Sequence, residues 1–182
     1  MKLEQLISDI TTLQIRGDIE RDIHALQADS RHITPNDVFV ATVGTTVDGH
    51  DYIERAIDAG ATAIVCERLP RDRRDDICYI QVSDSLQALG QLASAYYGHP
   101  SRHVTLVGVT GTTIATLLYR LVRAAGHKAG LLSTVVNYID DVAVAATHTT
   151  PDPLELNALL ARMVDAGCSH VFMEVSSHSV VQ

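Results

Sequence analysis

A carboxylate, two hydroxyls and an imidazole follow one another in the segment MEVSSH, residues 173–178. Glu174 with Ser176 and Ser177 could surround a hydrated Mg²⁺, which takes one or two carboxylates and completes its shell with water and phosphate oxygens. The alternative is a strand end whose hydroxyls cap the next helix. His178 on its own fits a solvent-facing or supporting residue better than a metal ligand.

A second candidate is VTGTT, residues 109–113, where an apolar run turns at Gly111 into an amphipathic segment. A helix that begins directly after a strand offers backbone N–H groups and the positive end of its dipole to an anion. A phosphate-binding loop of the type G-x-x-x-x-G-K-[ST] needs a lysine, and none stands between Gly111 and Lys128. The pattern alone therefore leaves a nucleotide loop and an ordinary turn equally open.

Two further polar loops could bind an anionic ligand. In ATHTTPDP, residues 146–153, His148, Thr149 and Thr150 precede a helix start and suit an anionic sugar or a carboxylate. The plain alternative is a turn before a helix that Asp152 caps. GTTVDGHD, residues 44–51, is a similar loop, and its spacing alone favours a simple turn.

The elements that position these loops alternate between strands and helices. In residues 1–98 we expect an amphipathic helix over 1–14, strands at 38–41, 63–66 and within 77–84, a helix that stops at Gly60, and a capped helix within 83–98 that Gly98 and Pro100 close. These elements predict a small N-terminal α/β domain.

A second α/β unit is expected from residue 99 onward. The apolar run 104–109 predicts a central parallel strand covered on both faces. We then expect a helix over 113–125, a strand within 128–140, a helix that Asp152 begins and Gly167 ends, and a strand at 170–174. The buried face expected of the helix over 113–125 consists of Ile114, Leu117, Leu118, Leu121 and Val122. In a parallel sheet ligands bind beyond the carboxyl ends of the strands, so the polar loops should converge at one edge.

Composition restricts the partners. A formal net charge of −8 argues against nucleic acid, which needs clustered Lys and Arg. No run is apolar enough to span a membrane and the first residues lack a signal-peptide core, so we expect a cytoplasmic protein.

The charge run at 68–76 predicts a solvated loop. Cys66, Cys78 and Cys168 lack metal or redox spacing and are expected to be buried thiols.

Together these motifs resemble the Mur ligases. The resemblance rests on GVTGTTIATLLYRL, ATHTTPDP, MEVSSH, the upstream DSR at 29–31 and VDGHDYIERAIDAGATAIVCE at 47–67, and it covers essentially the whole chain. ATHTTPDP and MEVSSH are specific to the member that adds the third residue of the peptidoglycan stem peptide. The implied organisation is a UDP-MurNAc-binding domain over 1–98 and the first part of a P-loop-type ATP-binding domain over 99–182. A C-terminal domain that selects the amino acid would be absent from this chain.

The implied activity is an ATP-dependent, ADP-forming amide ligation. ATP converts the D-Glu carboxyl of UDP-N-acetylmuramoyl-L-Ala-D-Glu into an acyl phosphate, and a diamino acid then displaces phosphate. Both diaminopimelate and lysine stay open as the diamino acid, and diaminopimelate is favoured. Mg²⁺ would assist, and we expect a monomer. The resemblance assigns substrate contacts to Ser30, Thr45, Thr46, Val47, His148, Thr149, Thr150, Ser176 and Gln182, the ATP loop to Gly111, Thr112 and Thr113, and the Mg²⁺ ligand to Glu174.

The chain departs from the family at one point. The family pattern T-G-T-N-G-K-T-T is shortened to TGTT at residues 110–113, so the catalytic lysine is missing. Either the loop is truly short, and no ATP turnover is expected, or the natural protein carries the lost residues and this sequence omits them; we favour the second. Two rival functions stay open: a binding module for UDP-muramoyl-peptide without ATP turnover, and a generic P-loop NTPase without affinity for UDP-sugars.

Overall fold

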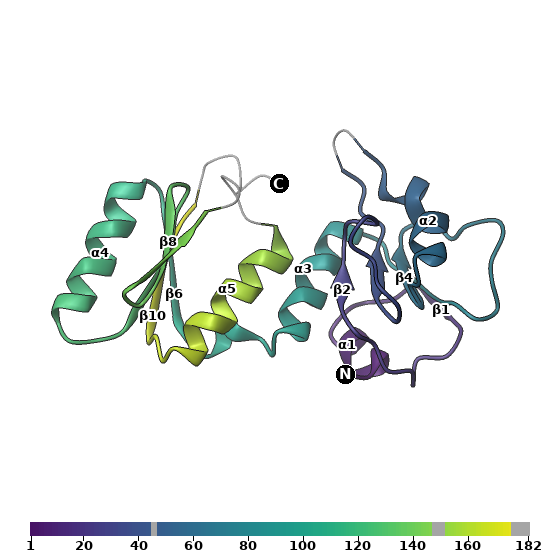
Figure 1. Cartoon of the computed structure of the whole chain (residues 1–182), viewed down its shortest axis with the longest axis horizontal. Helices are drawn as coiled ribbons and strands as arrows, with labels where there is room; N and C mark the ends of the chain where they lie inside the picture. The colour runs from purple at the N-terminus through teal and green to yellow at the C-terminus, as the bar shows by residue number, and fades with distance from the viewer. Residues whose placement is uncertain (45–46, 147–151, 176–182) are drawn as a thin grey trace. The chain divides into compact units, whose positions relative to one another are not determined.

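A computed structural model describes residues 1–44, 47–146 and 152–175, and the chain divides into two compact units, residues 1–96 and 97–182 (Figure 1). Each unit is built around its own β-sheet with helices packed on it. The expected α/β fold class, a small N-terminal α/β unit followed by a unit with parallel strands, is confirmed. None of the helices in the described ranges is long and apolar enough to cross a membrane.

The sheet of the first unit has the order β1-β5-β4-β3-β2 within the described residues. Its strands are β1 (Gln14–Arg16), β2 (Leu26–Gln27), β3 (Val38–Val40), β4 (Ala63–Cys66) and β5 (Cys78–Gln81). Only β1 runs antiparallel, pairing with β5 at the sheet edge. β4 is buried along its whole length, because it pairs with a strand on each side and has both faces covered.

Helices cover this sheet through alternating side chains. Phe39, Ile64 and Tyr79 join a core cluster with α2 (Ile53–Asp58), which follows the short helix η1 (Gly49–Tyr52). α1 (Leu3–Ile7) and α3 (Ser85–Tyr96) contact each other, and α3 also contacts β2. Cys66 and Cys78 are buried free thiols, as expected, and burial raises the pKa of Cys66 to about 11.

The N-terminal helix is shorter than predicted. Leu3, Leu6, Ile7 and Ile10 are all buried, so the predicted apolar face is correct. The helix nevertheless ends at Ile7, and the chain turns into the sheet where Leu13 N donates to Gln81 O at 2.7 Å. Pairing with β5 therefore replaces the last turns of the expected helix.

The sheet of the second unit has the order β6-β10-β7-β8-β9 within the described residues. β6 (Thr105–Val109), β7 (Ala129–Leu132) and β10 (His170–Glu174) are parallel, and β10 lies between the other two. α4 (Thr112–Ala124) and α5 (Pro153–Asp165) pack on opposite faces of the sheet through separate core clusters, and η2 (Pro100–Arg102) contacts α5. Asp152 caps α5 as predicted, since its carboxylate accepts from Glu155 N at 2.8 Å.

The segment 128–140 forms more than the single strand that the sequence predicts. After β7 the chain makes an antiparallel hairpin of β8 (Val136–Ile139) and β9 (Val142–Ala145), so the sheet is mixed. Ser133 closes the turn between β7 and β8, donating to Val136 O at 2.6 Å. The side-chain amide oxygen of Asn137 also accepts from Ser133 N at 3.0 Å.

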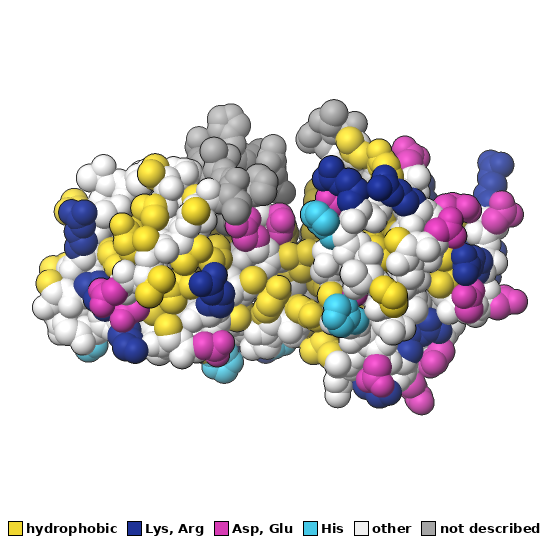
Figure 2. Space-filling view, viewed as in Figure 1, with side chains coloured by type: hydrophobic (Ala, Val, Ile, Leu, Met, Phe, Trp, Pro, Cys, Tyr) yellow, Lys and Arg dark blue, Asp and Glu magenta, His cyan; other side chains and the backbone are white. Residues whose placement is uncertain are grey.

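Two expectations about burial in this unit are wrong. β6 lies at the edge of the described sheet rather than at its centre, because only β10 pairs with it, and Leu106 is 39% exposed. α4 packs through Ala115 and Tyr119, which leaves part of its predicted buried face exposed: Ile114, Leu117 and Leu121. Figure 2 shows hydrophobic side chains on the surface of this unit.

Candidate functional site

The carboxyl ends of β6, β7 and β10 bring three polar segments together in the second unit. Glu174 pairs in register with Val109, directly before the turn at 110–111. Its Oε1 accepts from the Thr112 hydroxyl at 2.8 Å, and its Oε2 accepts from Thr134 N at 3.2 Å and the Thr134 hydroxyl at 3.1 Å. The strand-end rule thus places Glu174 and Thr112 correctly at one edge.

These contacts set the charge of Glu174. Burial raises the pKa of its carboxyl, but the hydrogen bonds from Thr112 and Thr134 favour the ionised form more strongly, so the pKa lies below its usual value. The result is a carboxylate held in place by neutral donors.

The donor set fits Mg²⁺ by type. A carboxylate beside two threonine hydroxyls offers hard oxygen ligands, and Mg²⁺ usually takes one or two carboxylates and keeps several waters. The described residues contain no group of three His, Cys, Asp or Glu side chains that could hold a metal by themselves. A cation here would therefore depend on ligand or water oxygens.

The turn before α4 does not fit a triphosphate. Gly111 adopts a φ of +100°, which glycine tolerates, and α4 begins at the very next residue, Thr112. This leaves no wrapping loop of backbone N–H groups. Lys, Arg and His are absent from the described residues that follow the three strands at this edge, namely 110–113, 133–135 and 175. The turn thus lacks both the length and the charge of a nucleotide loop.

Several predicted site residues lie outside the described residues: Thr45, Thr46, His148, Thr149, Thr150, Ser176, His178 and Gln182. The described ones fall into two groups. Gly111, Thr112, Thr113 and Glu174 belong to the second unit, where Thr113 is exposed. Ser30 and Val47 belong to the first unit.

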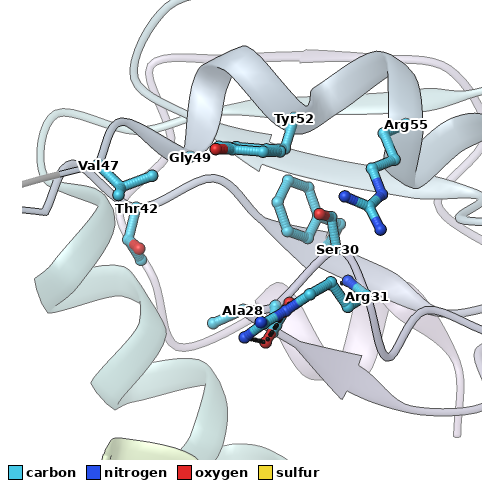
Figure 3. A pocket seen from close by; sticks show the side chains of 10 residues that line it. Ala28, Ser30, Arg31, Thr42, Val47, Gly49, Tyr52 and Arg55 are labelled. Atoms are coloured by element: carbon cyan, nitrogen blue, oxygen red, sulfur yellow. Dashed lines mark hydrogen bonds and ion pairs between the residues drawn. The ribbon is translucent and has the colours of Figure 1, made fainter.

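Ser30 and Val47 line the same pocket of about 490 Å³ (Figure 3). Its walls come from the segment after β2, from β3 and the following loop, and from η1 and α2: Ala28, Asp29, Ser30, Arg31, Phe39, Thr42, Val47, Gly49, Tyr52 and Arg55. Ser30 is only 8% exposed, and its hydroxyl makes no hydrogen bond within the described part of the chain. A hydroxyl that no described residue engages is available to a ligand.

The two arginines of the pocket differ in their pairing. Arg31 forms a bidentate ion pair with Asp29, and this bonding, with Arg31 as the main cause, lowers the Asp29 pKa to about 2. Arg55 has no hydrogen bond or ion pair from its side chain to any residue that the structure describes. Its guanidinium points toward Ser30 (Figure 3). Among the described residues, then, neither the Arg55 guanidinium nor the neighbouring Ser30 hydroxyl has a polar partner.

Sequence reasoning missed Tyr52 and Arg55. They stand three residues apart on η1 and α2, a spacing that places both side chains on one helical face. The sequence does contain an indication of a ligand site here, because an aromatic residue and a cation follow directly after the polar loop at 44–51. That this face meets residues 28–31 depends on packing between β2, β3 and α2, which the local sequence does not reveal.

Comparisons with known proteins decide the family. The model of the Mur ligase family, catalytic domain, matches residues 22–97, and that of the Mur ligase middle domain matches residues 109–182. The chain belongs to the Mur ligase family. Relatives include two proteins named UDP-N-acetylmuramoyl-L-alanyl-D-glutamate--2,6-diaminopimelate ligase, from Phocaeicola vulgatus (52% identity) and Parabacteroides distasonis (54%). Both matches cover 100% of this Mur ligase chain, which spans 38% of each relative's length.

Solved Mur ligase structures share the fold. A structure described as UDP-N-acetylmuramoyl-L-alanyl-D-glutamate--2,6-diaminopimelate ligase superposes with a TM-score of 0.77 at 18% identity, covering 100% of this chain and 37% of that one. A MurF ligase from Thermotoga maritima in complex with ADP gives a TM-score of 0.50 at 25% identity, covering 82% of this chain and 31% of that one. The matches to the two bacterial relatives run over 186 positions, four more than the 182 residues of this chain.

Proposed function

We propose that this chain supplies the nucleotide-sugar-binding unit and the first part of the ATP-binding unit of a cytoplasmic peptidoglycan precursor ligase. The substrate would be UDP-N-acetylmuramoyl-L-Ala-D-Glu, and the incoming amine that of diaminopimelate. Relatives named as ligases for this reaction, matched along the entire chain, support the ligase over a separate binding module. ATP would supply the phosphoryl group that turns the D-Glu carboxyl into an acyl phosphate.

The observation that carries the proposal is the pocket of the first unit. A uridine diphosphate sugar has a planar base, two negative phosphates and many hydroxyls. The pocket offers the ring of Tyr52 with the guanidinium of Arg55 and the hydroxyl of Ser30, the last two without a hydrogen-bond partner among the described residues. Arginine suits phosphate recognition because its planar donors form paired hydrogen bonds with phosphate oxygens.

The second unit contributes differently. We propose that Glu174, with the hydroxyls of Thr112 and Thr134, would hold Mg²⁺ in a ligase with a complete loop. We derive no ATP-dependent step through the turn at 110–113, because it is too short and carries no cation. The extra four alignment positions equal the number of residues that the turn lacks relative to the family pattern. We infer that the shortening lies at this turn.

Calorimetric titration with UDP and with UDP-N-acetylmuramoyl-L-Ala-D-Glu tests the proposal. We expect both to bind with one site per chain, and Ser30→Ala to weaken both. Binding of neither would contradict the assignment of the pocket. Absence of ATP hydrolysis is expected from this chain in either case, because the turn at 110–113 is short and carries no cation.

A further inference from the structure

Two chain segments that hydrogen-bond to each other form one wall of the pocket. These segments, residues 42–44 and 47–49 and here called the pocket loop, contribute Thr42, Val47 and Gly49 to the lining. Its two flanks are joined by hydrogen bonds from Gly49 N to Thr42 O at 2.8 Å and from Gly44 N to Val47 O at 3.0 Å. A Cβ at Gly49 would lie 2.8 Å from both Thr42 N and Thr42 O, so only glycine allows the flanks to approach this closely.

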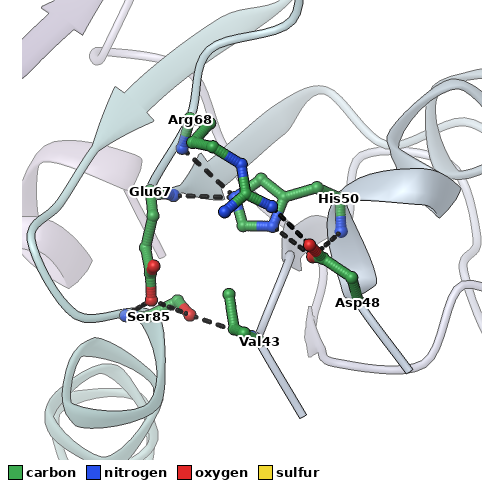
Figure 4. Close-up of polar contacts among 6 residues, drawn as sticks. All are labelled: Val43, Asp48, His50, Glu67, Arg68 and Ser85. Atoms are coloured by element: carbon green, nitrogen blue, oxygen red, sulfur yellow. Dashed lines mark hydrogen bonds and ion pairs between the residues drawn. The ribbon is translucent and has the colours of Figure 1, made fainter. Parts of the chain in front are cut away.

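The second flank is tied down by Asp48. Its Oδ1 accepts from the His50 backbone N–H at 3.0 Å and from His50 Nδ1 at 2.6 Å, and its Oδ2 accepts from the Arg68 guanidinium (Figure 4). Bonding from His50, first through its backbone and then through its side chain, lowers the Asp48 pKa to about 2. Asp48 is therefore ionised at neutral pH.

His50 connects this flank to the end of β4. Its Nε2 accepts from Glu67 N at 3.0 Å and from Arg68 N at 3.2 Å. Because Nε2 faces two N–H donors, it must be the unprotonated nitrogen, and Nδ1 carries the hydrogen that points to Asp48. The ring is 9% exposed and has both nitrogens engaged, so its orientation is fixed.

The first flank of the pocket loop, residues 42–44, is also connected to Glu67, through Ser85. Val43 N donates to the Ser85 hydroxyl at 3.2 Å, and that hydroxyl donates to Glu67 Oε1 at 2.7 Å. Ser85 N also donates to Glu67 Oε1, at 2.9 Å, and Gln81 Nε2 donates to Glu67 O at 2.9 Å. Both flanks of the pocket loop thus end on Glu67 and Arg68, the two residues that follow β4.

We propose that Asp48, His50, Glu67 and Arg68 form a clasp that positions the pocket loop and thereby sets the affinity of the pocket for a uridine nucleotide. None of the four clasp residues lines the pocket, so they act through the pocket loop and are positioning residues. The part of the proposal that concerns the nucleotide rests on the proposed function. A wall held in its bound position before the ligand arrives lowers the entropy cost of binding.

His50→Asn and His50→Ala distinguish the contact of His50 Nδ1 with Asp48 from the contacts of Nε2 with the Glu67 and Arg68 amides. Asparagine can still donate to Asp48 from the position of Nδ1 but is too short to accept from the Glu67 and Arg68 amides, whereas alanine loses both contacts. Arg21→Ala is the matched control. It removes hydrogen bonds of 2.7 Å to Thr62 O and 2.9 Å to Asp76 O in the same unit and touches no pocket residue.

Two readouts are taken on the whole chain: amide hydrogen exchange without ligand, and calorimetric affinity for UDP. We expect His50→Ala to accelerate exchange at Gly44 and Gly49 and to weaken UDP binding about tenfold, the factor that corresponds to one lost hydrogen bond to a charged group. His50→Asn should fall between His50→Ala and the wild type. Arg21→Ala should change thermal stability but neither loop exchange nor UDP affinity.

The outcomes separate the clasp from the proposed function. Unchanged exchange at Gly44 and Gly49 in His50→Ala would overturn the clasp, whatever the protein binds. Accelerated exchange with unchanged UDP affinity would overturn its role in binding while the pocket assignment stands. If the wild type fails to bind UDP at all, the proposed function fails, and with it the affinity part of this proposal, while accelerated exchange would still support the positional part.

Discussion

The hydroxyl of Thr112 donates a hydrogen bond of 2.8 Å to Oε1 of Glu174, a residue 62 positions further along the chain. This contact joins the start of α4 to the end of β10, and Thr134 joins the loop after β7 to the same carboxylate. A group expected to hold a cation therefore also fastens three segments of the second unit to one another.

Thr112→Val should lower the free energy of unfolding by about 1–2 kcal/mol, since it leaves one carboxylate oxygen without its donor. Urea denaturation at pH 7 measures the change. Thr116→Val is the matched control on the same helix, because the Thr116 hydroxyl donates only to the Thr112 backbone carbonyl and such local bonds contribute little. Equal losses in the two variants would show that the contact with Glu174 adds no stability.

Insertion of Asn-Gly-Lys-Thr between Thr112 and Thr113 should create nucleotide binding that the present turn lacks. The insertion supplies the backbone N–H groups and the lysine that a triphosphate requires. Titration with Mg²⁺ and ADP measures it, and we expect affinity at least about tenfold above the unmodified chain, the gain that one charge-assisted contact provides. The same insertion with alanine for lysine is the control. Tight ADP binding by the unmodified chain would refute our view of the turn.

Arg55→Ala should weaken UDP binding about tenfold through loss of a charged hydrogen bond. Stability should stay within about 0.5 kcal/mol because the side chain makes no polar contact in the described structure. Calorimetry and thermal unfolding give the two values. Arg71→Ala removes an exposed arginine from the charged loop at 68–76, outside the pocket, and should leave UDP affinity unchanged. An equal effect of both variants would indicate a general effect of net charge.

The Asp48 carboxyl predicts a specific loss of stability in acid. Its pKa is about 2 in the folded protein against an ordinary value of 3.8, so it stabilises the fold above pH 3.8 and loses this contribution as the pH falls toward 2. The contribution should stay below about 1 kcal/mol because solvent screens the pair. Urea unfolding at pH 5 and pH 3 should show a smaller pH effect in Asp48→Asn than in the wild type. Identical pH dependence would remove Asp48 from the acid transition.

Leu117→Ala and Leu131→Ala should separate exposed from buried leucines in the second unit. Leu117 is 59% exposed, whereas Leu131 is 2% exposed and belongs to the core under α4. We expect a loss below about 1 kcal/mol for the first and of about 2–5 kcal/mol for the second. Chemical denaturation compares them directly. A large loss from Leu117→Ala would mean that another surface covers it.

Helices and strands were predicted correctly where the sequence pattern was compatible with only one kind of element. The strand Ala63–Cys66 lies where it was expected, the helix Ser85–Tyr96 lies within the segment predicted for it, and Asp152 caps its helix as the sequence indicates. Burial was harder to predict. α4 carries two overlapping apolar stripes, and only packing against Phe172 and Leu131 selects the one that contains Ala115. Likewise, an apolar run such as 105–109 does not reveal whether a strand has one partner or two.

The candidate sites were predictable to a different degree. Topology alone brought Glu174 and Thr112 to the same edge, because the ends of parallel strands meet there. The pocket of the first unit needed more than local spacing. Arg55 lines the pocket together with residues 28–31, and His50 accepts a hydrogen bond from Glu67 at the end of β4. Both partners are distant in sequence and approach only in the folded chain.

The position of β10 between β6 and β7 also determines when the second unit can form. β6 and β7 are never paired with each other in the described sheet; both pair with β10, whose residues follow β6 by more than 60 positions. During synthesis the edges of β6 and β7 that pair with β10 therefore stay without their partner strand until residues 170–174 have left the ribosome. In the first unit β1 likewise depends on β5, but every strand of its described sheet lies before residue 97, so this unit can fold while the rest is still being translated.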